Sequence, residues 1–246
     1  MLLERDGEPI GLALGQAEAL NLAYEGLDAG AVLAGALRDF HGRTALVSSF
    51  GAEAAVLLHL VAQVDPGLPV LLVDTLLLFE ETLQYQRDLS AHLGLTNVQH
   101  VRPNPVDLAR VDPDWTLNRR DQDACCDVRK VLPLERALEP YSLLITGRKR
   151  FQAHTRAALA TFEADGTRLK VNPLASWSAA DLAAYMDAHA LPRHPLVAKG
   201  YPSIGCAPCT SKVAPGEDAR AGRWRGSDKV ECGIHFGPDG RILRAS

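Results

Sequence analysis

The stretch TALVSSFGAEAAVLLHLVAQVDPGLPVLLVDT, residues 44–75, determines the fold class. It opens with a short apolar run, Thr44–Ser48, which predicts a buried strand, and passes through a glycine-containing loop into an apolar run of helical length, Glu53–Val64. A Pro/Gly turn and a second apolar run, Val70–Val73, complete a strand–helix–strand unit. Because such units join parallel strands, the sequence predicts an α/β fold with a doubly wound, mostly parallel sheet.

The same alternation continues on both sides of this unit. Further helices are predicted over Ala31–Phe40, Glu80–Leu93 and around Asp127–Leu138, and further strands over Asn97–Val101 and Ser142–Thr146. We expect an N-terminal arm or peripheral helix over residues 1–28 and a nucleotide-binding α/β domain over 29–195. An irregular C-terminal lid or tail is expected over 196–246, where Gly, Pro, Cys and Arg replace the regular pattern.

Composition excludes several classes of protein. The chain has 246 residues and is 47% apolar, which is enough for a sizeable core, and its formal net charge of −4 argues against a general nucleic-acid binder. Its first residues, MLLERDGEPIGLALG, lack the basic start and unbroken apolar run of a secretory signal, and no segment reaches the ~18 apolar residues of a membrane span. We therefore expect a cytoplasmic protein with no membrane or nucleic-acid partner. The sequence leaves open whether it forms a homo-oligomer.

A candidate anion site follows the first predicted strand. The segment Ser48-Ser49-Phe50-Gly51-Ala52-Glu53 opens a predicted helix, so its backbone N–H groups and the helix N-terminus can receive a phosphate. Loops beginning at Asp74 and Gly147 leave the same edge of the sheet, where ligands of such folds bind. The segment lacks the Gly-Lys-Ser/Thr ending of the nucleoside-triphosphatase P-loop, and a tight structural turn is the alternative interpretation.

Five cysteines carry the strongest signal. An odd number in a chain without an export signal favours metal binding or thiol chemistry over disulfides. Cys125-Cys126 and Cys206-x-x-Cys209 could together supply four thiolates, and a four-iron cluster suits adjacent cysteines because each sulfur takes its own iron. Zinc remains an alternative, since zinc ribbons also use two pairs. A thioredoxin-type dithiol would need Cys206 and Cys209 at the start of a helix, whereas they lie late in the chain and enclose a proline.

The fifth cysteine, Cys232, lies outside both pairs. It sits between charged residues and a glycine near the chain end, where a side chain is accessible, and a neighbouring cation would favour its reactive thiolate. The alternative is a cysteine packed as a small apolar residue. Cations that the fold could gather around a phosphate or sulfate follow predicted strand ends or flank the cysteines; they are Arg129, Lys130, Arg148, Lys149, Arg150, Arg156, Arg220 and Arg223. Solvated surface charge is the alternative for each of them.

Together these residues resemble the assimilatory adenylyl-sulfate/phosphoadenylyl-sulfate reductase family, a branch of the adenine-nucleotide α-hydrolase-like fold. The resemblance runs from about residue 43 to 236, and its most specific parts are CCDVRK (residues 125–130), CAPC (206–209) and ECGIH (231–235). It implies that Cys125, Cys126, Cys206 and Cys209 ligate a [4Fe–4S] cluster and that Cys232 is the catalytic nucleophile. Members with both cysteine pairs generally reduce adenylyl sulfate, which is therefore the expected substrate.

The resemblance also implies a substrate-binding set. Ser48 and Gly51 would lie at the nucleotide, and Gly147 and Arg156 on the adenosine side. The residues expected around the phosphosulfate are Lys130, Arg220, Arg223 and His235, with Lys130 linking cluster and substrate electrostatically.

The implied reaction is reduction of adenylyl sulfate to sulfite and AMP through an S-sulfocysteine on Cys232, in sulfate assimilation and cysteine biosynthesis. Because 14 residues follow Cys232, we expect a separate thioredoxin or glutaredoxin to be the electron donor. One alternative is a phosphoadenylyl-sulfate reductase, with residues 148–150 binding the 3′-phosphate. Another is a zinc-stabilised nucleotide-binding or sulfur-relay module.

Two segments depart from the family pattern. Residues 73–76 read Val-Asp-Thr-Leu where relatives usually have Leu-Asp-Thr-Gly, which places a bulky residue at a position of a permissive glycine. Residues 148–152 read Arg-Lys-Arg-Phe-Gln instead of the commoner Arg-Arg-Asp-Gln-Ser. Neither departure is expected to touch the cysteines.

Overall fold

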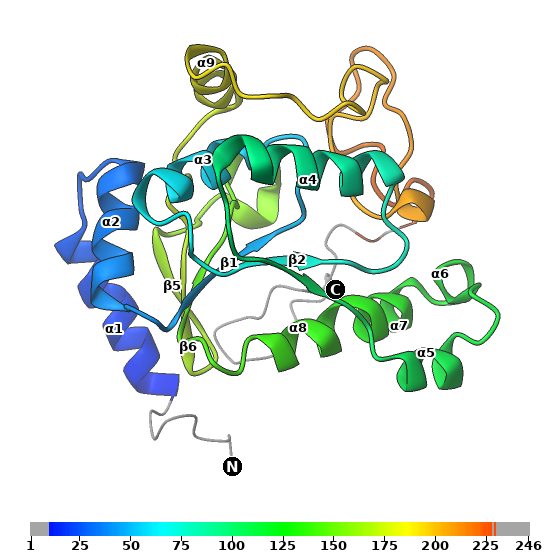
Figure 1. Cartoon of the computed structure of the whole chain (residues 1–246), viewed down its shortest axis with the longest axis horizontal. Coiled ribbons are helices and arrows are strands. Elements are labelled where there is room, and N and C mark those ends of the chain that lie inside the picture. Colours follow the sequence, from blue (N-terminus) through cyan, green and yellow to red (C-terminus); the bar gives the residue numbers. More distant parts are fainter. Residues whose placement is uncertain (1–9, 228, 230–246) are drawn as a thin grey trace.

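The computed structural model describes residues 10–227 and Lys229. Its centre is a six-stranded sheet in the order β3-β2-β1-β4-β6-β5, and every neighbouring pair is parallel except β5 with β6 (Figure 1). The strands are β1 (Thr44–Ser48), β2 (Val70–Val73), β3 (Val98–Val101), β4 (Leu143–Ile145), β5 (Phe162–Asp165) and β6 (Arg168–Val171). The predicted α/β fold with a mostly parallel, doubly wound sheet is confirmed.

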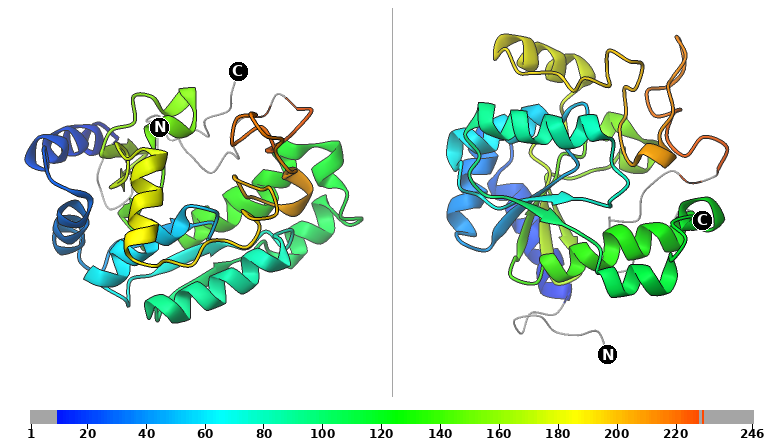
Figure 2. Two further views of the ribbon diagram at one scale, coloured as in Figure 1. Left: turned by 90° about the horizontal axis from the view of Figure 1, so that it is seen from above. Right: turned by 45° about the vertical axis from the view of Figure 1, so that its right-hand side comes forward.

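Helices cover both faces of the sheet, as Figure 2 shows. The α-helices are α1 (Ile10–Ala23), α2 (Ala29–Asp39), α3 (Ala54–Val64), α4 (Glu80–Leu93), α5 (Pro105–Val111), α6 (Leu117–Arg120), α7 (Gln122–Cys126), α8 (Leu132–Ala137) and α9 (Ala179–Ala188). The larger core lies on the face of α2, α3 and α4 and includes Leu33, Leu58 and Leu143. A smaller core lies between the other face and α8, around Leu134 and Leu144.

The predicted elements at the start of the sheet agree with the structure. Strands β1 and β2 and helix α4 have the predicted bounds. The sequence analysis missed the β5–β6 hairpin and α9. The hairpin has a recognisable signal, because Asp165-Gly166 stands between two alternating runs and Gly166 adopts a φ of 66° in the turn.

The helix predicted around Asp127–Leu138 begins earlier and is not regular. It starts at α7, where the Asp121 carboxylate accepts hydrogen bonds from the N–H groups of Asp123 (3.0 Å) and Ala124 (2.9 Å). The next turn, η1 (Asp127–Val131), is a π-helix that leads into α8. Such turns are rare and recur at functional sites, and this one directly follows the paired cysteines.

The outer parts of the chain are attached in different ways. The Asn21 side chain of α1 donates to the Phe162 carbonyl (2.9 Å) and accepts from the Phe162 N–H (2.8 Å), so α1 is held on β5. From residue 196 on, the only helix in the described part of the chain is the short 3₁₀ turn Ala207–Cys209. No helix among the described residues has the length and apolarity to cross a membrane. The division at residues 28 and 195 and the cytoplasmic location remain predictions.

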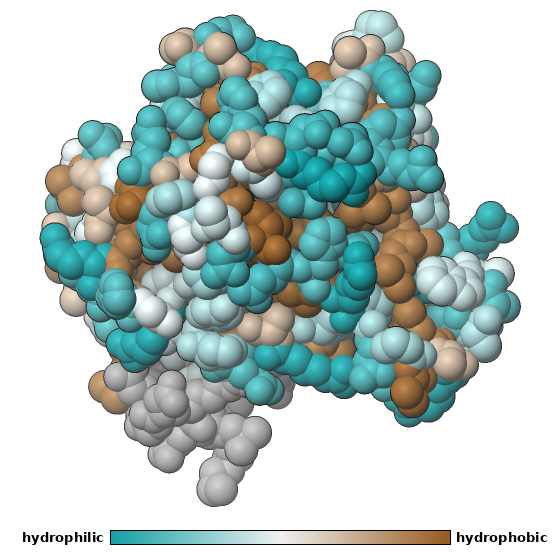
Figure 3. Space-filling view, in the orientation of Figure 1, coloured by the Kyte–Doolittle hydropathy of each residue, from teal (hydrophilic) through white to brown (hydrophobic). Residues whose placement is uncertain are grey.

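The surface in the orientation of Figure 1 is mixed. Hydrophilic residues are interspersed with hydrophobic ones on this face (Figure 3). This is the ordinary surface of a folded domain.

A buried histidine ties the segment after α9 to α4. His194 is 1% exposed; its Nδ1 accepts from the Leu196 N–H (3.1 Å), so its Nε2 donates to the Thr82 hydroxyl (3.1 Å). Burial lowers the pKa of His194 to about 4, with Glu81 opposing the shift. The native protein therefore holds this imidazole neutral.

We predict that His194 makes stability fall in mild acid. Below pH 6.5 the unfolded chain protonates this imidazole while the native protein resists until about pH 4, so its contribution to the free energy of unfolding drops by about 2 kcal/mol between pH 7 and 5. Urea denaturation at both pH values measures this drop. His194→Gln should show a smaller pH dependence than the wild type, and equal slopes in the two proteins would contradict the prediction.

Candidate functional site

A cavity of about 340 Å³ opens at the carboxyl ends of the parallel strands. Its walls are the loop after β1, the segment after β4, the π-helical turn η1 and the irregular chain over residues 202–224. Seven basic and three acidic side chains line it within the described part of the chain: Lys130, Arg148, Lys149, Arg156, Lys170, Arg220 and Arg223, with Glu53, Asp165 and Asp218. The excess of positive charge suits an anionic ligand.

The loop after β1 forms one wall through its backbone. The Ser48 hydroxyl accepts a hydrogen bond from the Phe50 N–H (3.1 Å), and Phe50 adopts a left-handed φ of 47° with its ring fully buried. Gly51 lines the cavity immediately before the first turn of α3. The loop is thus held by its own hydrogen bond beside the cavity, and its role as a phosphate-binding turn remains a prediction.

A chain of polar contacts joins this loop to the segment after β4. The sequence analysis did not predict these contacts. Glu53 Oε2 accepts from Lys149 Nζ (2.6 Å) and from Gln152 Nε2 (2.8 Å), and Gln152 Oε1 accepts from Arg156 Nη1 (2.6 Å). The β1 loop and the segment after β4 are therefore cross-linked at the cavity. A sequence signal was absent because these residues are about a hundred positions apart.

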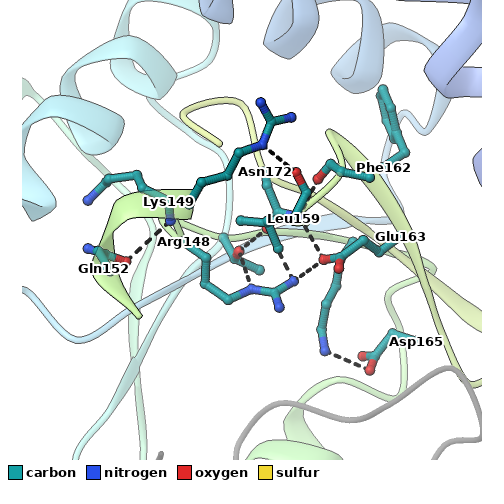
Figure 4. Close-up of polar contacts among 12 residues, drawn as sticks. Arg148, Lys149, Gln152, Leu159, Phe162, Glu163, Asp165 and Asn172 are labelled. Carbon is teal, nitrogen blue, oxygen red and sulfur yellow. Dashed lines mark hydrogen bonds and ion pairs between the residues drawn. The ribbon is translucent and has the colours of Figure 1, made fainter. Parts of the chain in front are cut away.

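The cations at 148–150 have partners within the fold, and Figure 4 shows those of Arg148. Arg148 pairs with Glu163 and also donates to the side chains of Thr146 and Asn172 (3.3 Å each). Lys149 pairs with Glu53, and Arg150 Nε donates to the Leu159 carbonyl (2.9 Å). The sequence analysis offered these three cations as an alternative subsite for a 3′-phosphate. In the structure, carboxylates neutralise the charges of Arg148 and Lys149, and Arg150 bonds a backbone carbonyl.

The four paired cysteines come together at the end of the cavity. Cys125, Cys126 and Cys206 are buried and Cys209 is half-buried. Burial, and then the neighbouring Cys126, raise the pKa of the Cys125 thiol to about 12, with smaller contributions from Cys206 and Cys209. Burial and Cys206 likewise raise the pKa of Cys209, while Lys130 and Arg223 lower it. The thiols are therefore close enough to influence one another, although α7 and residue 206 are some eighty positions apart.

The loop after β2 contacts this group, which the sequence analysis did not expect. Thr75 Oγ1 lies 3.2 Å from Cys206 Sγ, and the Ala207 N–H donates to the Leu77 carbonyl (2.8 Å). Leu76 adopts a left-handed φ of 62° there, with its N–H bound to Asp74 Oδ1 (3.1 Å). The leucine that replaces glycine thus keeps a backbone conformation suited to glycine, while the contacts with residues 206 and 207 come from its neighbours Thr75 and Leu77.

A buried guanidinium supports the π-helical turn. Arg129 is 1% exposed; its Nη2 pairs with Asp112 Oδ2 (2.6 Å), its Nη1 donates to the Thr75 carbonyl (3.0 Å), and its centre lies 4.5 Å from the Trp115 ring. Arg129 therefore serves the structure, whereas the adjacent Lys130 lines the cavity.

The segment over residues 202–224 brings two predicted arginines to the cavity. Arg220 and Arg223 both line it. Arg223 lies flat against Gly205, where an added Cβ would come within 2.3 Å of Nη2, and its Nη1 donates to the Ile204 carbonyl (3.3 Å). The absence of a side chain at Gly205 therefore lets the Arg223 guanidinium approach this closely.

All predicted substrate-binding residues except His235 line this cavity: Ser48, Gly51, Lys130, Gly147, Arg156, Arg220 and Arg223. Their roles remain predictions. Cys232 and His235 lie outside the described residues. The nearest described residue, Lys229, pairs with Asp123 on α7, so the chain toward Cys232 leaves the described structure beside the paired cysteines.

The four paired cysteines are the candidate ligands for a metal ion or cluster. Thiolate is the donor that zinc and iron–sulfur clusters take from proteins, so these cysteines are the residues that could hold such a group. Within residues 10–227 and Lys229, no three His, Cys, Asp or Glu side chains are arranged around the position of a single metal ion.

Comparison with known proteins identifies the family. The model of the phosphoadenosine phosphosulfate reductase domain matches residues 43–212. The chain belongs to the phosphoadenosine phosphosulfate reductase family. Within this family, a curated adenosine 5′-phosphosulfate reductase from Mesorhizobium japonicum is 58% identical over 197 residues, covering 80% of this chain and 78% of the relative. One from a Chelativorans species is 52% identical, covering 90% and 91%.

A solved structure shares the fold of this chain. The crystal structure of phosphoadenylyl-sulfate reductase from Candida auris superposes with a TM-score of 0.67 at 24% identity, over 87% of this chain and 99% of that one. At this identity the likeness supports the reductase-family fold alone.

We predict that the Arg129–Asp112 pair is needed for stability. Asp112→Ala would leave the guanidinium charged and buried without its partner, which costs about 3–5 kcal/mol of the free energy of unfolding. Chemical denaturation measures the loss. Asp114→Ala, which removes an exposed carboxylate from the same loop, is the matched control and should change stability little. Equal effects of both substitutions would refute the prediction.

Proposed function

We propose that the chain is a thioredoxin-dependent adenylyl-sulfate reductase that forms sulfite and AMP in assimilatory sulfate reduction. The observation that carries this proposal is the continuity of the cationic cavity with the four cysteines, through Lys130, Arg223 and Cys206 in its lining. The names of the relatives at 58% and 52% identity support the unphosphorylated nucleotide as substrate.

Substrate binding follows from the charge of the walls. The loop from Ser48 to Gly51 would receive the nucleotide with its N–H groups, and Gly147 and Arg156 would flank the adenosine. Lys130, Arg220 and Arg223 would neutralise the phosphosulfate, so that an anionic thiolate can approach an anionic substrate. Apolar side chains such as Leu57 and Leu174 line the remainder of the cavity and would exclude water from the base.

The proposed chemistry is two successive displacements at sulfur. The Cys232 thiolate attacks the sulfate sulfur of adenylyl sulfate; an S–S bond forms, the S–O bond to AMP breaks, and AMP leaves with that electron pair. A thiolate of the donor then attacks Cys232 Sγ, and sulfite leaves with the pair of the broken S–S bond. The second donor thiol resolves the mixed disulfide. The sulfur gains two electrons, and the donor dithiol becomes a disulfide.

A [4Fe–4S] cluster is the group that we propose for the four cysteines. The donor set fits it, because four thiolates is its standard ligand set and adjacent cysteines can each take a separate iron. When bound, the cluster would supply charge and a rigid cross-link between α7 and the 206–209 turn. Lys130 follows the first cysteine pair and lines the cavity, and it would balance the charge of the thiolates.

We predict that Cys232→Ala abolishes sulfite release while leaving AMP binding intact, because the nucleophile is lost and the cavity is not. Sulfite release is measured in an anaerobic assay with adenylyl sulfate and reduced thioredoxin. AMP binding is measured by calorimetry. Sulfite production near the wild-type rate would remove Cys232 as the nucleophile.

We predict that Cys209→Ser loses bound iron whereas Cys232→Ala retains about four iron and four sulfide per chain, as a four-thiolate cluster requires. Each variant is the control for the other, since both remove one thiol. Metal analysis of anaerobically purified protein provides the measurement. Stoichiometric zinc without sulfide in the wild type would instead support the zinc-stabilised module.

A further inference from the structure

We infer that Glu53 makes this site select a nucleotide with a free ribose 3′-hydroxyl over one with a 3′-phosphate. The inference rests on the proposed function, which it deepens by naming the residue that determines substrate choice. It is drawn from the contacts of one carboxylate in the cavity wall and from the pairing of the cations beside it.

Both hydrogen bonds of the Glu53 carboxylate go to one of its oxygens. The side chain is 33% exposed and lines the cavity just before α3. Its Oε2 holds both Lys149 (2.6 Å) and Gln152 (2.8 Å). In the part of the chain that the structure describes, no hydrogen bond involves Oε1. An ionised carboxylate of this kind can only accept hydrogen bonds, so Oε1 suits a hydroxyl donor.

Glu53 pairs with Lys149, a lysine in the cavity wall that could otherwise bind a phosphate. Lys149 is 3% exposed and lines the cavity; burial lowers its pKa, and Glu53 counteracts this shift. Because the pair is neutral overall, the wall carries no net positive charge at this point. Arg148 is likewise paired with Glu163, and Arg150 faces the Leu159 carbonyl.

Glu53 lies where the ribose of the proposed nucleotide would bind. The residue lies between the Ser48–Gly51 loop, proposed for the nucleotide, and the Gln152–Arg156 contact, proposed for the adenosine side. A ribose hydroxyl there could donate to Oε1, whereas a 3′-phosphate has no proton to donate and would meet a second anion. Dinucleotide-binding sites use the same chemistry, with an acidic residue for a ribose hydroxyl and an arginine for a ribose phosphate.

The test is Glu53→Gln, which keeps the size of the side chain and an acceptor for Lys149 but removes the negative charge. Calorimetry with AMP and with adenosine 3′,5′-bisphosphate gives the ratio of affinities, and kcat/KM on adenylyl sulfate and its 3′-phosphorylated form gives the kinetic ratio. We expect both ratios to shift toward the 3′-phosphorylated nucleotide by about tenfold or more, as relief of like-charge repulsion predicts.

Glu81→Gln is the matched control, because it likewise removes the negative charge from a Glu–Lys pair of similar length (Lys199 Nζ to Glu81 Oε1, 2.8 Å), but outside the cavity. It should leave both ratios at the wild-type value. A Glu53→Gln protein that binds AMP with unchanged ratios, or that loses both nucleotides equally, would overturn the inference alone. A wild-type protein that neither binds AMP nor releases sulfite from adenylyl sulfate would overturn the proposed function and the inference with it.

Discussion

The buried Arg129 guanidinium connects the parts of the chain from which the site is built. It reaches Asp112 in the loop before α6 and the Thr75 carbonyl at the end of β2, while its own backbone belongs to the π-helical turn after Cys125 and Cys126. Thr75 in turn contacts Cys206. One side chain thus sets the distance between a helix, a strand end and the second cysteine pair, and a charge this deeply buried tolerates little displacement from its partner.

The same principle of paired charge governs the cavity itself. A site for a multiply charged anion must be cationic, yet basic side chains that are buried without partners would be costly. The fold resolves this by giving Arg148 and Lys149 carboxylate partners and by supporting Arg223 against Gly205 and the Ile204 carbonyl. The acidic residues of the wall therefore limit how much positive charge a ligand meets.

The sequence predicted what depends on local pattern and missed what depends on distant contacts. The bounds of β1, β2 and α4 follow from apolar runs closed by turns, and the cysteine spacing was enough to single out the four thiols that the fold brings together. The π-helical turn was not predictable, because its residues have ordinary helical propensity and the long-range contacts of Arg129 carry no local signal. The contact between Glu53 and Lys149 was not predictable for the same reason, since it joins two separate strand ends.

The way in which α1 meets β5 has a consequence for solubility. Strand β5 is the edge of the sheet, and an open edge offers unpaired N–H and C=O groups to a strand of another molecule. The Asn21 amide bonds both groups of Phe162 at once, as the backbone of a neighbouring strand would. A single side chain thereby imitates one rung of a seventh strand, and with α1 in place this edge is closed to the strand-by-strand growth that leads to aggregates.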